Sequence, residues 1–348
     1  MHSMRNSHQK RSLTQSHSIF FLSIVFIVIL VIVTTLSASA QASKRVTRQA
    51  GASFKFTAAG DYGQTNYTTA NLTYIAHSGV SFHLALGDFS YDPSVNAATW
   101  SAYVKSLLPA NFPFEILEGG HDGSQIKTYA ADLPNHMANM TGTYAHQYSF
   151  DYPANAPLAR FIMITPGGNN SFAYSRGTPG YTWVSNAIDG ARAAKIHWVI
   201  VAMHQYCFVI GSTYCNGQDL LDLLLTKHVD LILQAQKHDY QASKQLALNT
   251  TTCTSLPVTN YNSHCVVNSS ASMTKGVGSV IVVTGTGGTT PELAINTKDP
   301  KIGYFRSWMG ANVNQSWGVS QFTVSSTQLS MQFVSVTGSF TDSFSING

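Results

Sequence analysis

Short apolar runs rich in β-branched and aromatic residues alternate with helix-like stretches along most of this chain. A strand and a helix each have one apolar face to bury, and their alternation along a chain is typical of a layered α/β sheet. We therefore predict an α/β fold for the residues that contain these runs. The strand-like runs are residues 54–59, 82–86, 114–117, 198–203 and 229–233.

Helical periodicity separates several of the predicted strands. Residues 94–108 begin with Ser94 as a candidate N-cap and carry apolar residues at helical intervals. Residues 181–195 and 219–228 show the same periodicity. These three segments are predicted helices.

The last third of the chain changes character. Residues 280–284 are apolar, and residues 322–336 alternate apolar with polar side chains. That alternation predicts antiparallel strands that close a second sheet. Residues 53–348 are enough for one large domain with a substantial core.

The first 40 residues are predicted to be a targeting segment and are set apart from the fold. Residues 19–36 form an apolar run without charge, preceded by three basic residues and followed by Ala38-Ser39-Ala40. The small-residue triplet fits a cleavage site, whereas the run is also near the length that spans a bilayer. The segment is therefore either a cleaved signal peptide or a transmembrane signal anchor. Residues 41–52 are small and polar, typical of a linker or pro-segment.

Two further patterns indicate an extracellular or luminal protein. Seven Asn-x-Ser/Thr sequons occur, and all four cysteines lie in the C-terminal half. Cys207 with Cys215 and Cys253 with Cys265 are the short-loop pairings, although four cysteines allow three connectivities. We predict a secreted, disulfide-bonded glycoprotein of the secretory pathway, held at a membrane only if the N-terminal segment is retained. The sequons begin at Asn66, Asn71, Asn139, Asn169, Asn249, Asn268 and Asn314.

Charge argues against one class of partner. The whole chain has a formal net charge of +4, but residues 1–40 carry three basic and no acidic residues, so the remainder has a net charge of +1. No basic stripe of the kind that binds nucleic acid is present in that remainder. We expect no nucleic-acid partner.

A candidate metal or phosphate ligand follows each of the five strand-like runs. The carboxyl ends of the strands in an α/β sheet face one crevice, so ligands that are distant in sequence can meet there. Carboxylates, imidazoles and a phenolate together suit iron, zinc or manganese. We therefore predict a metal site at the carboxyl ends of the strands. In chain order, the candidates are Asp61, Asp88, Tyr91, His121, Asp122, His204 and His238.

The order of these strand endings resembles the calcineurin-like metallophosphoesterases, and within them the purple acid phosphatases. That family has the ordered pattern GDxG, GDxxY, GNH(D/E), VxxH and GHxH. Here GDYG, GDFSY and VAMH match in full, whereas EGGHD and LQAQKHDY match in part. The resemblance runs from about Phe54 to the C-terminus. It implies a layered β-sandwich flanked by helices, in the order αββα, with the active site at the carboxyl ends of the strands.

The resemblance also implies a role for each matching residue. Asp88 would bridge the first metal to a second metal that His204 also binds. His121 would lie beside the leaving group as a hydrogen-bond donor or general acid. Asp122 would either orient His121 or satisfy a turn. The first metal, expected to be Fe³⁺, would be held by Asp61, Asp88, Tyr91 and His238.

The second metal site departs from the family pattern. Gly120 stands where the pattern has Asn, and Gln236 stands where it has the first His of GHxH. Glycine offers no side-chain ligand, and a neutral amide oxygen is a weaker donor than imidazole. We expect Zn²⁺, Fe²⁺ or Mn²⁺ to bind there weakly, if at all. Lys237 either supplies part of the missing charge or is a solvated loop residue.

Loss of one ion from a two-metal site removes several kcal/mol of Lewis-acid stabilisation, and each ~1.4 kcal/mol is tenfold in rate. We therefore predict an acid-phosphatase-like, metal-dependent hydrolase of phosphate monoesters whose activity this loss weakens. The alternative is a non-catalytic pseudo-phosphatase that retains one structural or binding metal. The expected substrate is a phosphorylated small molecule or protein, and no motif specifies it further.

Overall fold

The computed structural model describes residues 53–348 except 168–171, 206, 216 and 291–293. The predicted targeting segment 1–40, the linker 41–52 and the sequon residue Asn169 therefore lie outside the described residues. Within the described part of the chain, no helix is long and apolar enough to cross a membrane.

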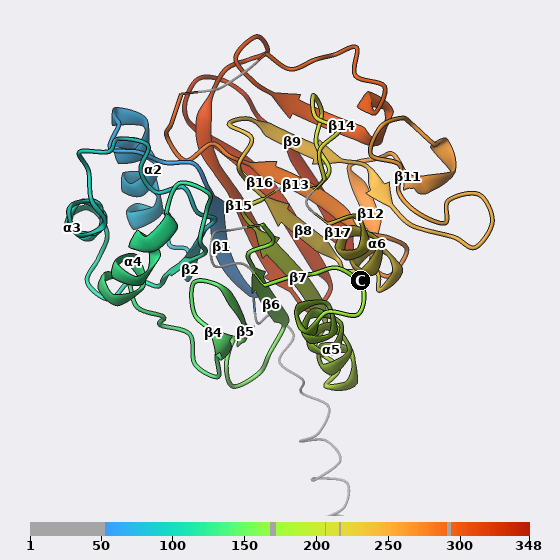
Figure 1. The fold of residues 1–348 in the computed structure, drawn as a ribbon, viewed down its shortest axis with the longest axis horizontal. Helices are drawn as coiled ribbons and strands as arrows, with labels where there is room; N and C mark the ends of the chain where they lie inside the picture. The colour runs from blue at the N-terminus through green and yellow to red at the C-terminus, as the bar shows by residue number, and fades with distance from the viewer. Residues whose placement is uncertain (1–52, 168–171, 206, 216, 291–293) are drawn as a thin grey trace, which may run out of the picture. The chain divides into compact units, whose positions relative to one another are not determined.

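Two large β-sheets form the centre of the domain (Figure 1). The first has seven strands in the order β12 (Ser272–Thr274), β17 (Ser343–Asn347), β16 (Gln328–Thr337), β15 (Trp317–Ser325), β1 (Ser53–Ala59), β2 (Phe82–Ala85) and β3 (Phe114–Ile116). The second has eight strands in the order β14 (Phe305–Met309), β9 (Tyr240–Ser243), β13 (Val280–Thr284), β8 (Leu231–Gln234), β7 (Trp198–Met203), β6 (Ala159–Ile164), β5 (Gln147–Tyr152) and β4 (Thr141–Thr143). A small pair, β10 (Gln245–Leu246) and β11 (Val266–Asn268), stands apart from both.

The main core lies between the two sheets. Successive side chains of a strand point to opposite faces, so each strand contributes alternate residues to this layer. Phe56 of β1 is fully buried, stacks on Phe82 with ring centroids 5.3 Å apart, and meets Phe161 of the other sheet edge-on at 5.1 Å. Burial of such a side chain contributes about 1.5–3 kcal/mol, and aromatic pairs contribute more through their geometry. This apolar layer therefore fixes how the two sheets face each other.

Helices cover both outer faces, which gives the four layers αββα (Figure 1). Apolar residues of α2 (Asn66–His77), α3 (Ala97–Leu107) and α4 (Ile126–Asp132) pack on β1, β2 and β3. Those of α5 (Pro179–Ala193) and α6 (Gln218–Thr226) pack on β6, β7 and β8. The predicted α/β fold of helix-flanked, layered sheets is confirmed.

Two details of the predicted elements are wrong. The N-cap of α3 is Asn96, whose side chain accepts the Thr99 N–H, whereas Ser94 bonds to Asp92 in the preceding turn. The late strands do pair antiparallel, β15 with β16 and β13 with β9, but they do not close one separate sheet: β13 joins the second sheet, whereas β15 and β16 join the first beside β1. Strand alternation indicates which face is buried but not which strand lies alongside.

The four cysteines form two disulfides, Cys207–Cys215 and Cys253–Cys265. These are the short-loop pairings among the three connectivities considered. Both disulfides lie in the second half of the domain, and Cys265 ends the short 3-10 helix Ser263–Cys265. Disulfides persist in oxidising compartments, so they fit a protein of the secretory pathway.

Candidate metal centre

The loops that follow β1 and β2 are joined by their backbones. The N–H groups of Asp61, Tyr62 and Gly63 donate to the carbonyls of Gly87, Asp88 and Phe89 at 3.0, 2.9 and 2.9 Å. Asp61 and Asp88 both adopt left-handed backbone conformations, with φ of 64° and 54°. Residues other than glycine seldom adopt this conformation, and such strain concentrates at functional sites. The paired loops hold the two buried carboxylates side by side.

The phenol oxygen of Tyr91 is surrounded by three candidate ligand atoms. It lies 2.8 Å from Asp61 Oδ1, 3.0 Å from Asp88 Oδ2 and 2.9 Å from His238 Nε2. A phenol has one hydrogen and can donate it to only one of these atoms. Convergence of more acceptors than hydrogens is the arrangement expected of ligands around a cation. All four predicted ligands of the first site therefore come together.

Both histidines of the cluster are anchored through Nδ1. His204 Nδ1 donates to the carbonyl of Leu86 at 2.6 Å, and His238 Nδ1 donates to the carbonyl of Thr290 at 3.0 Å. This fixes Nε2 as the atom that faces the carboxylates, 3.3 Å from Asp88 Oδ2 for His204 and 3.4 Å from Asp61 Oδ1 for His238. A carbonyl at the far nitrogen is the usual support of a metal-binding imidazole.

The charges of the cluster also fit a cation. Burial raises the pKa of Tyr91, and the adjacent Asp61 and Asp88 raise it further, so the phenol ionises only if a positive ion is present. Burial opposes ionisation of Asp88, but His204 and the His121 N–H lower the pKa of Asp88 to about 2. Burial lowers the pKa of His204, yet Asp88 outweighs it and raises that pKa to about 9. A metal at His204 Nε2 would therefore displace a proton.

Three buried ligands satisfy the geometric requirement for one ion. Ligand atoms of Asp61, Asp88 and His204 lie within 4.8 Å of one another. His204 Nε2 is buried and faces Asp88 Oδ2 at 3.3 Å, where a metal could take the place of the shared proton. The residues present therefore fit a transition-metal ion.

The residues predicted to weaken the second site lie beside this cluster. The N–H of Gln236 donates to Asp61 Oδ2 at 2.9 Å, and its side-chain Oε1 is buried without a hydrogen-bond partner. Gly120 is exposed, and a Cβ added there would meet no atom within 4 Å. The cluster therefore adjoins the backbone of Gln236 and has open space where the family pattern has asparagine.

His121 and Asp122 take different positions relative to the cluster. The exposed His121 has its ring 4.6 Å from that of Tyr91, and its backbone N–H donates to Asp88 Oδ1 at 2.8 Å. The buried Asp122 carboxylate accepts the N–H groups of Gly119, Phe89 and Asp88 at 2.6, 2.9 and 3.0 Å. Of its two predicted roles, these contacts support the turn. We interpret Asp122 as a residue that positions the Asp88 loop and not as a catalytic one.

The described part of the loop after β13 supports the cluster through its backbone. Its Thr290 carbonyl anchors His238, and a Cβ on Gly285 would lie 2.6 Å from Asp61 Oδ2. Glycine is therefore required where this loop passes Asp61. A backbone carbonyl has no signature in the sequence, and the glycine resembles any turn residue, so sequence reasoning missed this support.

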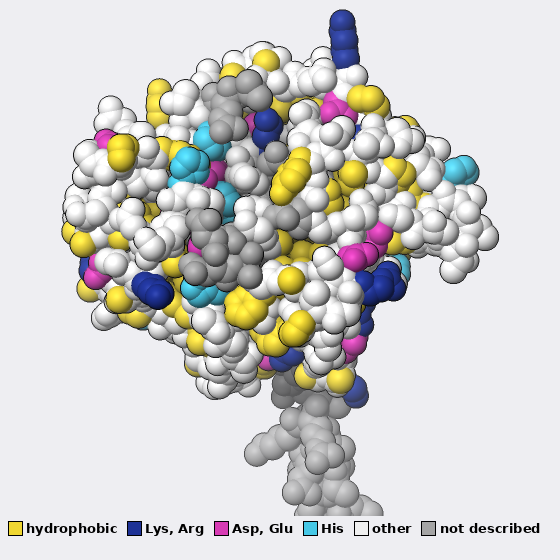
Figure 2. Space-filling model, in the orientation of Figure 1, with side chains coloured by type: hydrophobic (Ala, Val, Ile, Leu, Met, Phe, Trp, Pro, Cys, Tyr) yellow, Lys and Arg dark blue, Asp and Glu magenta, His cyan; other side chains and the backbone are white. Residues whose placement is uncertain are grey.

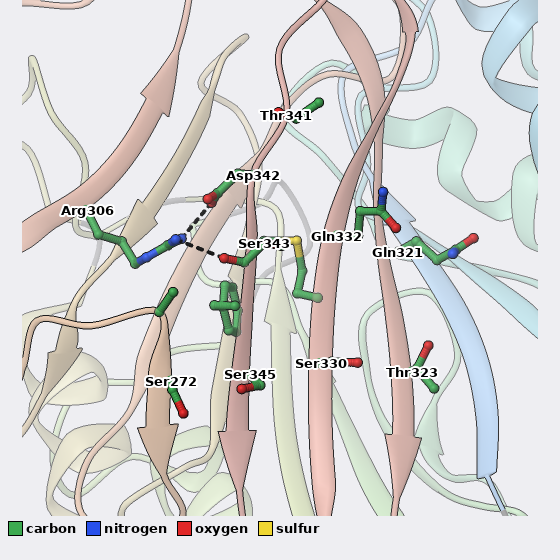
Figure 3. A pocket seen from close by; sticks show the side chains of 13 residues that line it. Ser272, Arg306, Gln321, Thr323, Ser330, Gln332, Thr341, Asp342, Ser343 and Ser345 are labelled. Atoms are coloured by element: carbon green, nitrogen blue, oxygen red, sulfur yellow. Dashed lines mark hydrogen bonds and ion pairs between the residues drawn. The ribbon is translucent and has the colours of Figure 1, made fainter.

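A wide hollow on the described surface lies away from the cluster (Figure 3). It has a volume of about 820 Å³ and lies on the outer face of β12, β17, β16 and β15, lined mainly by hydroxyl and amide side chains. Arg306, its one cation, already donates to Asp342 and to the Ser343 carbonyl at 2.7 and 2.9 Å. None of the predicted ligands lines it. Histidine and acidic side chains instead gather on the face shown in Figure 2.

The αββα sandwich, with the predicted ligands after β1, β2, β7 and β8, has the calcineurin-like metallophosphoesterase fold. The structure is similar to that of a purple acid phosphatase from yellow lupin (Lupinus luteus) seeds, with a TM-score of 0.60, 16% identity, and coverage of 85% of this chain and 54% of that one. It is also similar to PhoD, with a TM-score of 0.52, 14% identity, and coverage of 85% and 70%. At these identities the likeness establishes the fold.

The sequence relatives of the chain are purple acid phosphatases, as the motif resemblance predicted. Purple acid phosphatase 21 of Arabidopsis thaliana is 26% identical over 208 residues, and purple acid phosphatase 18 of the same plant is 22% identical over 205. Each match covers 55% of this chain and 45% of the relative, so the chain spans about half the length of the curated relatives it matches. No family model matches the chain.

Proposed function

We propose that this protein is a metal-dependent phosphoesterase that hydrolyses phosphate monoesters. The observation that carries the proposal is the convergence of Asp61, Asp88, Tyr91 and His238 on one point, with His204 adjoining through Asp88. Iron in the ferric state suits the phenolate and carboxylates of the first position. Zn²⁺, Fe²⁺ or Mn²⁺ would bind the second position through Asp88, His204 and Gln236.

Each side chain has a chemical task in this proposal. The bound metal would polarise the phosphoryl group and lower the pKa of a water ligand. The Nδ1 bonds of His204 and His238 orient both imidazoles so that Nε2 faces the carboxylates. His121, exposed beside the Tyr91 ring, would donate a proton or hydrogen bond to the leaving alcohol.

The proposed substrate is a phosphorylated small molecule or protein, met outside the cell or in a luminal compartment. The exposure of His121 supports a site that large substrates can reach. The near-neutral charge of residues 41–348 gives no support to a nucleic-acid substrate. The membrane would be contacted only through the N-terminal segment if it is retained.

A second candidate is a non-catalytic relative that keeps one metal for structure or binding. It is favoured by Gly120, which supplies no ligand, and by Gln236, whose amide oxygen binds zinc or iron more weakly than imidazole. The first candidate is preferred because the buried Gln236 Oε1 has no hydrogen-bond partner and can still act as a ligand.

Hydrolysis of a generic aryl phosphate by the metal-loaded protein separates the two. We expect measurable turnover that falls about 10²-fold in His121→Ala with unchanged metal content, because His121 is a proton donor and not a ligand. His136→Ala, which removes another exposed histidine, is the matched control and should leave turnover unchanged. Bound metal without turnover in the wild type would favour the non-catalytic candidate.

A further inference from the structure

The sequons differ in how the fold exposes their asparagines. Asn71 is fully buried, and its Nδ2 donates to the carbonyls of Thr286 and Gly287 at 3.1 and 3.0 Å. A sugar on Nδ2 would take one of these hydrogens and would have no space, so a glycan there is incompatible with the folded domain. Asn66, Asn139, Asn249 and Asn314 are exposed.

Asn139 is an exposed sequon residue that lines a groove. The groove has a volume of about 290 Å³, and Asn139 and Thr141, the first and third residues of one sequon, are both part of its wall. This volume is at the small end of ligand sites, ~300 Å³, and suits one monosaccharide better than an extended chain. The groove thus adjoins an acceptor asparagine and has the size of one sugar.

The opposite wall belongs to α5. Trp183 and Asn186 lie three residues apart and therefore share one face of that helix. Between the walls, Arg160 donates to Asp151 through Nε and Nη2 at 2.6 and 2.7 Å. One partly exposed indole ring among hydroxyl, amide and paired charged groups suits a sugar, whose C–H face packs on the ring while its hydroxyls meet polar atoms.

The groove also borders an exposed edge strand of the eight-stranded sheet. β4 ends the eight-stranded sheet, and its three residues are all exposed. An exposed edge strand presents unpaired backbone groups to other chains, and proteins protect such edges. Asn139 lies two residues before β4 begins, so a glycan on it would shield this edge.

We propose that Asn139 carries an N-linked glycan whose first N-acetylglucosamine lies in the groove between β4 and α5, against the Trp183 ring. Asn71 carries none, because chains modified there cannot form the folded domain. This proposal rests on entry into the secretory pathway and does not depend on the phosphoesterase function.

The first test is site-by-site occupancy in protein secreted from eukaryotic cells, measured by mass spectrometry of glycopeptides. Asn139 should be occupied and Asn71 unoccupied in the folded fraction, with the exposed Asn66 and Asn314 as references. Release of the Asn139 glycan by an amidase acting on the folded protein should be about tenfold slower than release at Asn314. A folded protein with a free Asn139, or with a glycan on Asn71, overturns the proposal.

The second test asks whether the glycan and Trp183 interact. Asn139 and Asn314 both have left-handed backbones, with φ of 60° and 48°, so aspartate removes either acceptor without new strain. Asn139→Asp should lower the melting temperature by about 2 °C in the wild type and by much less in Trp183→Leu, which keeps apolar packing without the ring. Asn314→Asp is the matched control and should have the same effect in both backgrounds. An equal loss of melting temperature on Asn139→Asp in the wild type and in Trp183→Leu would contradict the proposed contact between the glycan and the Trp183 ring.

Discussion

The Nδ1 atom of His204 lies 2.6 Å from the carbonyl oxygen of Leu86, and this hydrogen bond joins the two sheets at the candidate metal centre. His204 follows β7 of the eight-stranded sheet, whereas Leu86 follows β2 of the seven-stranded sheet. Asp61 and Asp88 likewise come from one sheet and His238 from the other. The ligand cluster therefore exists only while the apolar layer between the sheets holds them in register.

Asp122→Asn should act mainly by destabilising the folded protein and not by changing a chemical step directly. The carboxylate accepts three backbone N–H groups, and an amide must turn its NH₂ toward at least one of them. An unpaired buried donor costs about 1–3 kcal/mol, which should lower the melting temperature of the metal-free protein. The exposed Asp92→Asn is the control and should change it much less. Unchanged stability with reduced turnover would instead restore a direct role with His121.

Tyr91→Phe should abolish any visible colour while leaving the fold intact. A ferric ion bound to the Tyr91 phenolate gives a charge-transfer band, and phenylalanine removes the oxygen but keeps the ring. Absorption spectra and circular dichroism of both proteins measure these effects. A colourless wild type that contains zinc would show that Tyr91 has no special role in binding iron.

The triple variant Gly120→Asn, Gln236→His and Ala235→Gly should bind a second metal and raise phosphatase turnover at least ~tenfold, the effect of ~1.4 kcal/mol. Gly120 does not have a left-handed backbone and has free space around its Cβ position, so asparagine fits. Gln236 has φ of 65°, a conformation in which histidine is enriched. Each single change should do less, because ligands of one site act together. Two bound metals without a gain in turnover would show that activity is limited elsewhere.

The stability of the domain should fall as the pH falls from about 6.5 toward about 3, in part through His83. Burial lowers the pKa of His83 to about 3, so between these values the unfolded chain binds a proton that the folded one does not. His83 lies 2.8 Å from Thr57 Oγ1 and 2.7 Å from the Tyr62 hydroxyl, a network that neutral imidazole satisfies. The free energy of unfolding, measured with denaturant at several pH values in this range, should fall less steeply with decreasing pH in His83→Gln than in the wild type. The difference in slope should be up to ~1.4 kcal/mol per pH unit. Equal slopes in both proteins would contradict this assignment.

The strands of the fold that have a clear hydrophobic pattern in the sequence could be predicted from it. All five predicted strands occur, because short β-branched runs between helical segments leave few alternatives. The partner of residues 322–336 could not be predicted, since pairing with β1 joins residues more than 250 positions apart and alternation indicates only a buried face. Asn96 rather than Ser94 caps α3 because the turn at Asp92 already engages Ser94.

The proximity of the candidate ligands was predictable because strand ends converge, but the groups that support them were not. Asp61, Asp88, Tyr91, His204 and His238 each follow a recognisable strand. The carbonyls of Leu86 and Thr290, which set the tautomers of the two histidines, are backbone atoms without a sequence signal. The contacts of Asp122 depend on a loop conformation that no local pattern specifies.

Metal content is the most direct test of the account. Elemental analysis of the purified protein after gentle dialysis should find one tightly held transition-metal ion per chain, because only the first site keeps its full set of ligands. The isosteric variant Asp61→Asn should lose that ion and remain folded, whereas the surface variant Asp92→Asn should keep it. Two stoichiometric ions would show that the second site is stronger than its ligands indicate. A folded wild-type protein that holds no transition metal would contradict the central claim.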